Sequence, residues 1–503
     1  MRVLSSRILL GSVASLAMMS IAGAADFPMK AKAPAVQYVK ICSLYGAGFY
    51  YIPGTDTCLK IGGYIRTQVE TQSSGGGLIR GTSTSVQGLG TRDNTNDIQY
   101  RLRAVVTFDA RTQGEYGTLR SYFVSGIEAT TPGTTAAGTT GGAPYWDRAF
   151  IQFAGFTVGK AQSFFDIYSY GGSRSYLNVR TSGDNGAAGL MMWAYTAQFG
   201  GGFSATLSLE DPRGHNLIGV GLITGPGPLV GSTFGGIANG LANNLGGTGF
   251  QVPDIVANLR VDQPWGFAGI SGALHQVAGS YWTANAAGCA APPLNIACGH
   301  PEDKWGYAFG AGVQLNVPGM PGDTTGVGFV YAKGAVGYTL APGAGGMLLV
   351  DGGTVSLATA RDAVFRNPAP GVGGELLLTE SWSVNAHYEH NWTRALKTSV
   401  YGGLTQINYP AGAKTLICGT CSGGRDPDYS FWLIGSRTQW SPWGGQLNIG
   451  VDVVYAHINT AQLFATGTLV TVTPVAGVAQ PGKLQGDNDN LSVIFRVQRN
   501  WYP

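Results

Sequence analysis

Arginines recur on the polar faces of three segments early in the chain, and carboxylates follow in a later segment. The arginines are Arg66, Arg101, Arg103 and Arg120. Arg101 and Arg103 are two residues apart, so they lie on one face of an extended segment. Asp166 and Asp184 belong to the segment that starts near Ser163. Fixed cations facing fixed anions across a narrow aqueous passage create a field that orients polar solutes and repels apolar ones. The alternative is that these charges only hydrate an inner wall or pair with each other.

Six cysteines fall into three local pairs. The pairs are Cys42 and Cys58, Cys289 and Cys298, and Cys418 and Cys421. In an oxidising compartment, three local disulfides are the natural interpretation, and the pairing is inferred from proximity in the sequence. Cys418 and Cys421 could instead form a redox pair, but no strand–helix context supports that alternative.

Motifs for catalysis or metal binding are weak. The segment His387-Tyr-Glu389-His390 resembles a helical metal motif, but its alternation predicts a strand, on which His387 and His390 point to opposite faces. We find neither a Gly-x-Ser-x-Gly nucleophile elbow nor a phosphate-binding loop, and no convergent nucleophile and base. We therefore expect no enzymatic activity, no cofactor and no metal site.

The elements that must position the arginines show a period of two. Between Asp97 and Asp109, apolar and polar side chains alternate, and only Val105 breaks the polar face. The apolar face consists of Ile98, Tyr100, Leu102, Ala104, Val106 and Phe108. Segments 60–70 and 203–210 repeat the pattern. Such alternation predicts strands with one apolar face and one polar face.

We expect sixteen strands, joined alternately by short turns and by long, polar, glycine-rich loops. The predicted strands are 60–70, 97–109, 118–128, 146–154, 156–162, 191–200, 203–210, 254–263, 266–278, 305–317, 326–338, 373–379, 381–392, 428–440, 446–458 and 489–501. The predicted long loops are 71–96, 129–145, 163–190, 211–253, 279–304, 339–372, 393–427 and 459–488. Short turns on one rim and long loops on the other are typical of a bacterial outer-membrane barrel, which has an even number of strands.

The composition supports a membrane environment for these strands. Charged residues make up 12% of the chain, against roughly 25% in ordinary soluble proteins. A barrel hides its outer face in hydrocarbon and needs no surface charge there. It must also be closed, since unpaired backbone groups in hydrocarbon cost several kcal/mol each. A net charge of only +3, with no basic face, argues against nucleic acid as a partner.

The N-terminus predicts export. Arg2 and Arg7 precede an apolar stretch, and Ala22-Gly23-Ala24 fits a cleavage site, so we expect residues 1–24 to be a signal peptide. Residues 25–59 would form a periplasmic N-terminal segment that a Cys42–Cys58 disulfide cross-links. Residues 60–503 would form the barrel. The predicted fold is all-β: a 16-stranded antiparallel transmembrane β-barrel with long extracellular loops and short periplasmic turns. Sixteen strands leave an aqueous channel, whereas eight are filled by side chains.

Three segments resemble a known family, the alphaproteobacterial porins. They are Tyr38–Arg66, with its YVKICSLYGAGFYYIPGTDTCLKIGGYIR motif, Trp146–Asp166, and the tail Ser492–Arg499. The resemblance implies a sixteen-stranded barrel, usually a homotrimer, with its third long loop folded into the lumen as a constriction. It also implies passive diffusion of small hydrophilic solutes and ions through the outer membrane, with outer-membrane lipid and lipopolysaccharide as further partners. The chain departs from the family at its end, where Tyr502 and Pro503 follow Trp501.

Two other functions stay open on the sequence alone. One is a more specific channel for a sugar or an anion, in which aromatic residues near the third loop would form a binding slide. These residues are Phe164, Phe165, Tyr168 and Tyr170, and they could equally hold the loop to the wall. The other is an adhesin that uses its long loops, above all 211–253.

Overall fold

The computed structural model describes part of the chain in detail. The described residues are 40–72, 78–80, 98–131, 143–168, 174–177, 189–215, 223–224, 236–237, 241–242, 251–279, 301–340, 346–351, 354–366, 375–418, 426–459, 469–472, 480–484 and 487–501. The chain divides into two compact units, residues 1–40 and 41–503, and all elements below belong to the second. Among the described residues, no helix is both long and apolar enough to cross a membrane.

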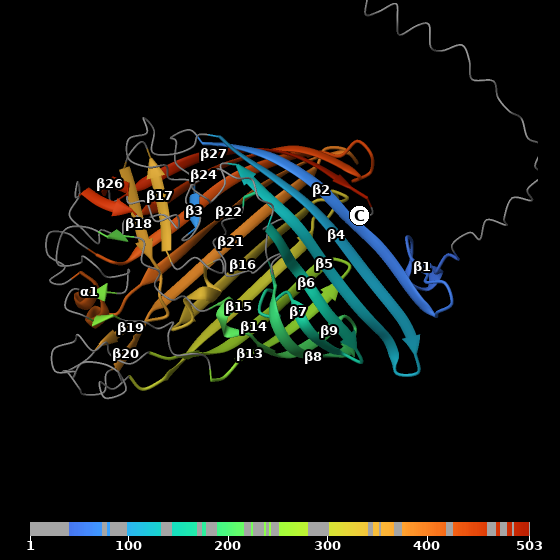
Figure 1. Cartoon of the computed structure of the whole chain (residues 1–503), viewed down its shortest axis with the longest axis horizontal. Coiled ribbons are helices and arrows are strands. Elements are labelled where there is room, and N and C mark those ends of the chain that lie inside the picture. Colours follow the sequence, from blue (N-terminus) through green and yellow to red (C-terminus); the bar gives the residue numbers. More distant parts are fainter. Residues whose placement is uncertain are drawn as a thin grey trace, which may run out of the picture. The chain divides into compact units, whose positions relative to one another are not determined.

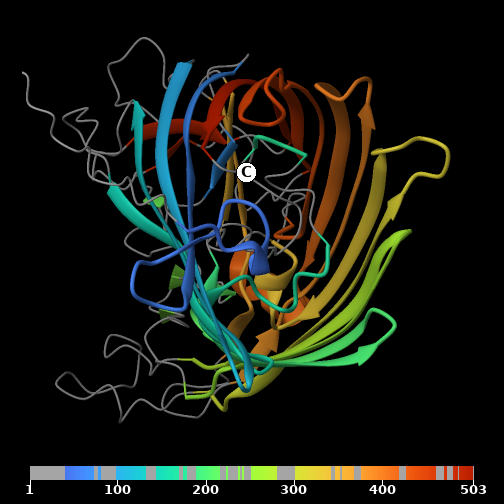
Figure 2. The same cartoon turned by 90° about the vertical axis from the view of Figure 1, so that its right-hand side faces the viewer.

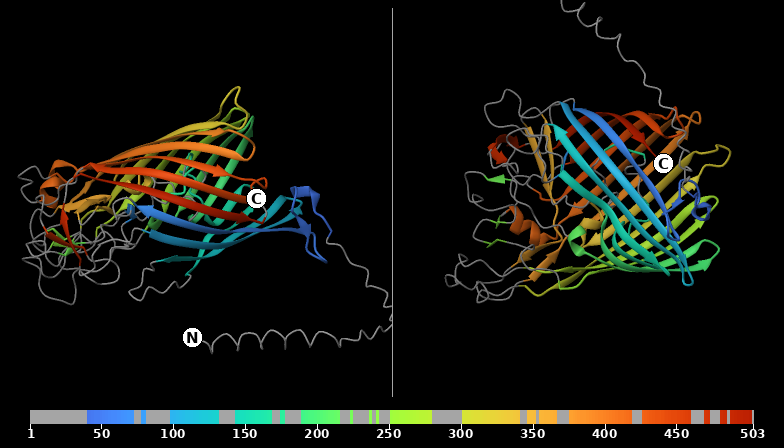
Figure 3. Two further views of the ribbon diagram at one scale, coloured as in Figure 1. Left: turned by 90° about the horizontal axis from the view of Figure 1, so that it is seen from above. Right: turned by 45° about the vertical axis from the view of Figure 1, so that its right-hand side comes forward.

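Sixteen antiparallel strands form the wall of a barrel (Figure 1). In chain order they are β2 (Thr57–Gln72), β4 (Ile98–Gly114), β5 (Gly117–Thr131), β6 (Ala143–Phe153), β7 (Phe156–Ala161), β8 (Leu190–Gly200), β9 (Phe203–Glu210), β13 (Asp254–Gln263), β14 (Gly266–Val277), β15 (Lys304–Asn316), β16 (Thr324–Lys333), β21 (Glu380–Asn391), β22 (Leu396–Asn408), β23 (Tyr429–Trp440), β24 (Leu447–Asn459) and β27 (Asn488–Asn500). The strands run obliquely around the barrel (Figure 3).

The ring is closed by its first and last strands. Each strand pairs with its neighbours in the chain order of the ring, and β27 pairs with β2 from Tyr64 opposite Asn500 to Gln72 opposite Ser492. Closure leaves no free edge, and this removes the cost of unpaired backbone groups in hydrocarbon. The predicted fold class is confirmed.

Side chains alternate between the two faces of the wall. On β4, the even-numbered residues Leu102 and Val106 are exposed on the outside. The odd-numbered residues Arg103 and Asp109 are shielded on the inside. An apolar band facing lipid and a polar face toward water is the arrangement that a transmembrane barrel requires. The period of two in the sequence therefore predicts correctly which face each residue takes.

Short turns gather at one end of the barrel, on the right in Figure 1. They include the connections at 115–116, 154–155, 201–202 and 264–265. Gly202 shows why such a turn needs glycine: its φ is +77°, and a Cβ there would lie 2.0 Å from the carbonyl oxygen of Asp262. Described parts of the long connections, such as β17 (Gly346–Asp351) and α1 (Ala411–Cys418), lie at the opposite end (Figure 1).

One predicted strand was wrong and one barrel strand was missed. The segment 373–379 is not part of the barrel: β20 (Glu375–Leu378) forms a separate hairpin with β19 (Ala363–Arg366). The twelfth and thirteenth barrel strands are β21 and β22, joined by a short turn at 392–395, and β22 falls in the segment expected to be a long loop. The sequence pattern misleads in both places. Gly402 and Gly403 interrupt the alternation of β22, and the apolar run 376–378 resembles a barrel strand although it belongs to the β19–β20 hairpin.

Part of the barrel interior is an apolar core rather than open space. It forms between β22, β23, β24, Ile494 of β27 and described residues of three connections: loop three (162–189), loop six (334–379) and loop seven (409–428). Its fully buried members include Val336, Val364, Ile407, Phe431, Leu433, Val454 and Ala456. Figure 2 looks into the barrel from the short-turn end and shows described parts of loop three inside the ring of strands. The inner surface therefore carries an apolar cluster over β22–β24 and, on β27, β2, β4 and β5, a row of charged side chains that we call the polar wall.

Smaller elements complete the described structure. A six-stranded sheet joins β3 (Leu78–Arg80), β10 (Ile223–Thr224), β17 (Gly346–Asp351), β18 (Thr354–Thr359), β25 (Leu469–Val472) and β26 (Gln480–Leu484), and β11 (Gly236–Ile237) pairs with β12 (Leu241–Ala242). Short helices are η1 (Ser43–Tyr45), η2 (Pro212–Gly214), η5 (Val336–Tyr338) and α1 (Ala411–Cys418). Before β2, the short strand β1 (Tyr50–Tyr51) pairs with it, and Cys42 and Cys58 form a disulfide. Cys289, Cys298 and Cys421, and the side chain of Cys418, lie outside the described residues.

Candidate functional site

Basic side chains occupy two adjacent rungs of the polar wall, where a rung is a row of inward-facing residues opposite one another. The first rung runs Gln498, Arg66, Arg103 and Glu128 across β27, β2, β4 and β5. The second runs Arg496, Gln68 and Arg101 across β27, β2 and β4. Arg66 stands directly opposite Arg103, at a Cβ separation of about 5 Å, where like charges destabilise the strand pair.

Glu128 is the carboxylate that pairs with this cluster. Its Oε1 lies 2.6 Å from Nη2 of Arg101, and it also accepts a hydrogen bond from Nε of Arg103. The other two arginines use neutral partners: Nε of Arg66 donates to Gln498 at 2.7 Å, and Nη2 of Arg496 donates to Gln68 at 2.7 Å. Positive charge therefore exceeds negative charge on the two rungs.

A second ionic group lies nearer the short-turn end of the same wall. Asp109 accepts two hydrogen bonds from Arg111, at 3.0 and 2.8 Å, and two from Arg120, both at 3.0 Å. Arg120 also donates to Gln152 at 3.0 Å. Here two guanidinium groups share one carboxylate, in the fork geometry that favours strong charge-assisted bonds.

Aromatic rings support the arginines of both groups. The guanidinium carbon of Arg66 lies 4.7 Å from the ring centre of Tyr64, and that of Arg103 lies 5.2 Å from the ring centre of Tyr145. Arg120 stands 4.6 Å from Tyr122. Cation–π contacts of this kind hold each guanidinium along the wall and limit its rotamers.

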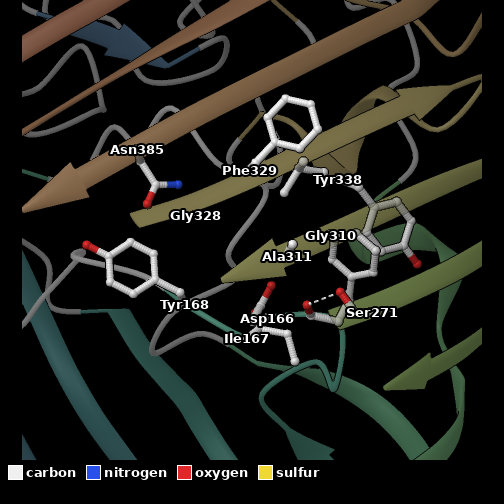
Figure 4. A pocket seen from close by; sticks show the side chains of 12 residues that line it. Asp166, Ile167, Tyr168, Ser271, Gly310, Ala311, Gly328, Phe329, Tyr338 and Asn385 are labelled. Atoms are coloured by element: carbon white, nitrogen blue, oxygen red, sulfur yellow. Dashed lines mark hydrogen bonds between the residues drawn. The ribbon is translucent and has the colours of Figure 1, made fainter. Parts of the chain in front are cut away.

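Loop three begins on the opposite side of the ring, against β9, β13 and β14. Oγ of Ser163 donates to Oε2 of Glu210 at 2.6 Å, and the amide of Phe164 donates to Oε1 of the same carboxylate at 3.0 Å. Oγ of Ser271 then donates to the carbonyl of Phe165 at 2.9 Å. Asp166 follows and borders a small cavity against β14–β16 (Figure 4).

Further along, the described residues Tyr168 and 174–177 of loop three contact β21, β24 and β27. Tyr168 is hydrogen-bonded to His387 on β21 and lies beside Asn385 in Figure 4. Asp452 on β24 accepts hydrogen bonds from the amide of Tyr176 at 2.5 Å and from Oγ of Ser175 at 3.2 Å. Loop three therefore spans from the wall opposite the arginines to the edge of the arginine cluster.

Tyr176 of loop three contacts the second basic rung through Arg496. Nη2 of Arg496 donates to the carbonyl of Tyr176 at 3.0 Å, and its guanidinium stacks 4.1 Å from the ring centre. Arg437 on β23 lies 5.4 Å from the same ring and pairs with Glu389 at 2.7 Å. The loop is thus fastened at the level of the two rungs.

The structure distributes the sequence-predicted charges over three places. Arg66, Arg101 and Arg103 come together on the two rungs, and Arg120 belongs to the Asp109 group. Asp166 lies on the far side of the ring from them, because the cavity that it borders is lined by β14–β16, which are six to eight strands away from β2 in the ring order. Asp184 lies outside the described residues. The field across the passage that these residues would create stays a prediction.

Sequence reasoning overlooked the nearest carboxylates and one arginine. Glu128 lies on the same face of β5 as Arg120, so the alternation that placed Arg120 could have found it. Asp109 is likewise on the polar face of β4, two residues before Arg111. Arg496 belongs to the last strand, and only closure of the ring brings it beside Gln68.

The two histidines of the weak metal motif lie on opposite faces of β21, as its alternation predicts. His387 is buried on the inside and contacts Tyr168. His390 is on the outside, where its Nδ1 lies 2.6 Å from Oδ2 of Asp323. The segment therefore does not bring both rings to one ligand.

A closed sixteen-stranded ring with an apolar outer band, an inward-folded loop and a charged inner wall defines a β-barrel membrane protein. The comparisons specify the class further. A sequence profile of the family described as the Porin subfamily matches residues 26–480, and the chain belongs to this family. It is accordingly a multi-pass protein of the outer membrane.

Relatives agree with this assignment, and a solved structure shares the fold. The outer membrane protein y4fJ of Sinorhizobium fredii is 33% identical over 236 residues, which cover 47% of this chain and 62% of that protein. Porin Omp2b of Brucella abortus is 30% identical over 271 residues, covering 52% and 62%. The matched region thus spans less than two thirds of either relative. The outer membrane channel DcaP of Acinetobacter baumannii shares the fold, with a TM-score of 0.54 and 10% identity over 90% of this chain and 99% of that one.

Proposed function

We propose that this protein forms a water-filled channel through which small hydrophilic solutes and ions diffuse passively across the outer membrane. The observation that carries the proposal is the division of the barrel interior. Described residues of loops three, six and seven pack over β22–β24 and Ile494 of β27, whereas β2, β4 and β5 keep Arg66, Arg103 and Glu128 on the inner face. Charged groups there require water, since unsolvated charges cost several kcal/mol each.

The same arrangement supports electrostatic selection along the passage. The arginines of the two rungs stand on one side, and Asp166 stands on loop three on the far side of the ring. We propose that Arg66, Arg101, Arg103 and Arg120 form the basic side of the constriction and that Asp166 and Asp184 contribute to its acidic side. Because Glu128 offsets only part of the basic charge, the passage would favour anions.

Assembly and targeting complete the proposal. We propose a homotrimer embedded in outer-membrane lipid and lipopolysaccharide, in keeping with the family. Residues 1–24 would be removed as a signal peptide, and residues 25–59 would lie in the periplasm, where the Cys42–Cys58 disulfide can form. Disulfides joining Cys289 to Cys298 and Cys418 to Cys421 also stay predictions.

The aromatic residues at the start of loop three support packing rather than a sugar slide. Phe165 is buried, with its ring centre 4.5 Å from that of Tyr338, and Tyr168 is buried against His387. Phe165 and Tyr168 are therefore largely shielded from a passing sugar, whereas Phe164 is half-buried. Tyr170 lies outside the described residues.

Liposome swelling and planar-bilayer recording test the channel. The purified protein should produce stepwise conductance, and sugars should enter liposomes at rates that fall smoothly with their size. Rates that saturate with sugar concentration would favour a sugar-specific channel. Normal barrel insertion without conductance or swelling would contradict the proposal.

A further inference from the structure

The two basic rungs differ from an ordinary charged wall in the arrangement of their donors. Arg66 and Arg103 face each other directly across β2 and β4, and Arg101 and Arg496 flank Gln68 on its two sides. Four guanidinium groups thus occupy adjacent positions with one directly paired carboxylate, Glu128. Like charges directly opposite one another cost stability, so an anion bound between Arg66 and Arg103 would relieve their repulsion.

The donors are also oriented before any ligand arrives. Arg66 rests on Tyr64 and Arg103 on Tyr145, while Gln498 and Glu128 fix one nitrogen of each guanidinium. Each guanidinium carries five N–H donors in a planar fork. In the part of the chain that the structure describes, the terminal nitrogens of Arg66 and Arg103 have no protein acceptor. Their side chains are shielded but not sealed, since that of Arg103 is 17% exposed.

Loop three limits how a solute can reach the rungs. Tyr176 covers Arg496 by stacking on it and by accepting its hydrogen bond. Arg496 is 6% exposed, so it is available mainly as a nearby charge. Contacts with a solute are left to Arg66, Arg101 and Arg103, beside the edge of the loop. A solute passing this edge meets two forks from adjacent strands.

We propose that Arg66 and Arg103 form a saturable binding site for small oxyanions that carry at least two negative oxygens, such as inorganic phosphate or a short dicarboxylate. Guanidinium forks match the oxygen spacing of both groups and bind them bidentately. Arg101 and Arg496 add positive potential, and Glu128 limits the affinity so that the solute can leave. This inference rests on the proposed channel function and adds a ligand class to it.

Competition between chloride and phosphate in single-channel recordings tests the site. Inorganic phosphate added at constant chloride should reduce the chloride current, and the reduction should saturate. Succinate should do the same if carboxylates are accepted, so the two probes separate phosphate from dicarboxylate as the preferred class. Sulfate serves as a second tetrahedral dianion.

Three variants locate the effect. Arg66→Gln and Arg103→Gln should each raise the half-blocking phosphate concentration about tenfold or more, because each removes charge-assisted hydrogen bonds. Arg66→Lys should retain anion preference yet weaken the block, because it keeps the charge but loses the fork. The matched control is Arg260→Gln: Arg260 is also on an inward-facing position, but it is paired with Asp262 at 2.8 Å near the short turns, and its loss should leave the block unchanged.

Each result has a definite meaning. Saturable block that weakens in both glutamine variants and persists in Arg260→Gln supports the site. Normal conductance steps without any saturable block would overturn it while leaving the channel intact. Equal block in all variants would place binding elsewhere and would also overturn it. A loss of anion preference without any change in block would show that the arginines act only through their field. Absence of conductance in the wild type would instead refute the proposed function.

Discussion

At the residue scale, Glu128 neutralises part of the positive charge that the two basic rungs carry. It pairs with Arg101 and Arg103 at once, and its side chain is 23% exposed. No motif marks it in the sequence. Its position follows from alternation along β5, but its importance follows from the register between β4 and β5, which sets it opposite Arg103. Register across strands far apart in the chain is the information that a local pattern lacks.

Replacing Glu128 with glutamine should increase anion preference. The change keeps the size of the side chain and removes its negative charge, so the field of the rungs becomes more positive. The reversal potential in a potassium chloride gradient should shift toward the chloride equilibrium potential. Glu380→Gln is the matched control, because Glu380 pairs with Lys333 on the other face of the sheet. An equal shift in both variants, or none in Glu128→Gln, would contradict this assignment.

Asp323 lies in the short turn before β16. We expect its carboxylate to stabilise the folded barrel at neutral pH and to lose this effect in acid. The amide of Asn391, together with His390 and Tyr388, donates hydrogen bonds to this carboxylate and lowers its pKa from 3.8 to about 2. Because the pKa in the folded state lies below that in the unfolded state, the stabilisation is present above about pH 4. It is lost as the pH falls toward 2.

The heat resistance of the folded barrel in detergent measures this effect. Wild-type protein should lose heat resistance between about pH 4 and pH 2. Asp323→Asn should be less stable at neutral pH and should show a smaller loss over that interval. If the two proteins responded identically to acid, the contacts of Asp323 would not contribute to stability.

At the element scale, strands with clean alternation could be predicted and elements that depend on tertiary packing could not. Strands β9 and β13 match their predicted ranges to the residue, since polar and apolar positions separate fully on β9 and almost fully on β13, where Val256 and Gln263 are the exceptions. Strand β22 was missed because Gly402 and Gly403 weaken its pattern. Ile407, Phe431 and Val454 are apolar although they face the barrel interior, because they pack in one cluster with residues of loop six. Only the folded chain reveals which loop returns to which wall.

The fastening of loop three provides a test at this scale. Asp452 accepts hydrogen bonds from the amide of Tyr176 and from the hydroxyls of Ser175 and Tyr401. Asp452→Asn removes the charge that strengthens these bonds, each worth roughly 1.5–3 kcal/mol. The loop should detach more often, and the open-channel current should become noisier. Tyr401→Phe removes one bond from the same carboxylate and should have a smaller effect. Unchanged current noise in Asp452→Asn would show that the loop is held by other contacts.

At the scale of the whole molecule, closure and asymmetric filling work together. Closure joins β27 to β2 and thereby places Arg496 in the basic cluster. Described residues of loops three, six and seven cover the inner face of β22–β24, and Tyr176 covers Arg496 of β27, so we propose that the passage runs beside β2, β4 and β5. In the proposed channel, a solute would travel beside arginines on one side and beside loop three on the other. The selectivity of the proposed channel would then depend on which wall the loops leave uncovered.

The most direct test of this account is the reversal potential of the wild-type channel in a potassium chloride gradient, measured alongside the Arg101→Ala, Arg103→Ala double variant. The account predicts stepwise channels that prefer chloride over potassium, and a marked loss of that preference when the two arginines are removed. Channels with the same ion preference and conductance in both proteins would contradict it.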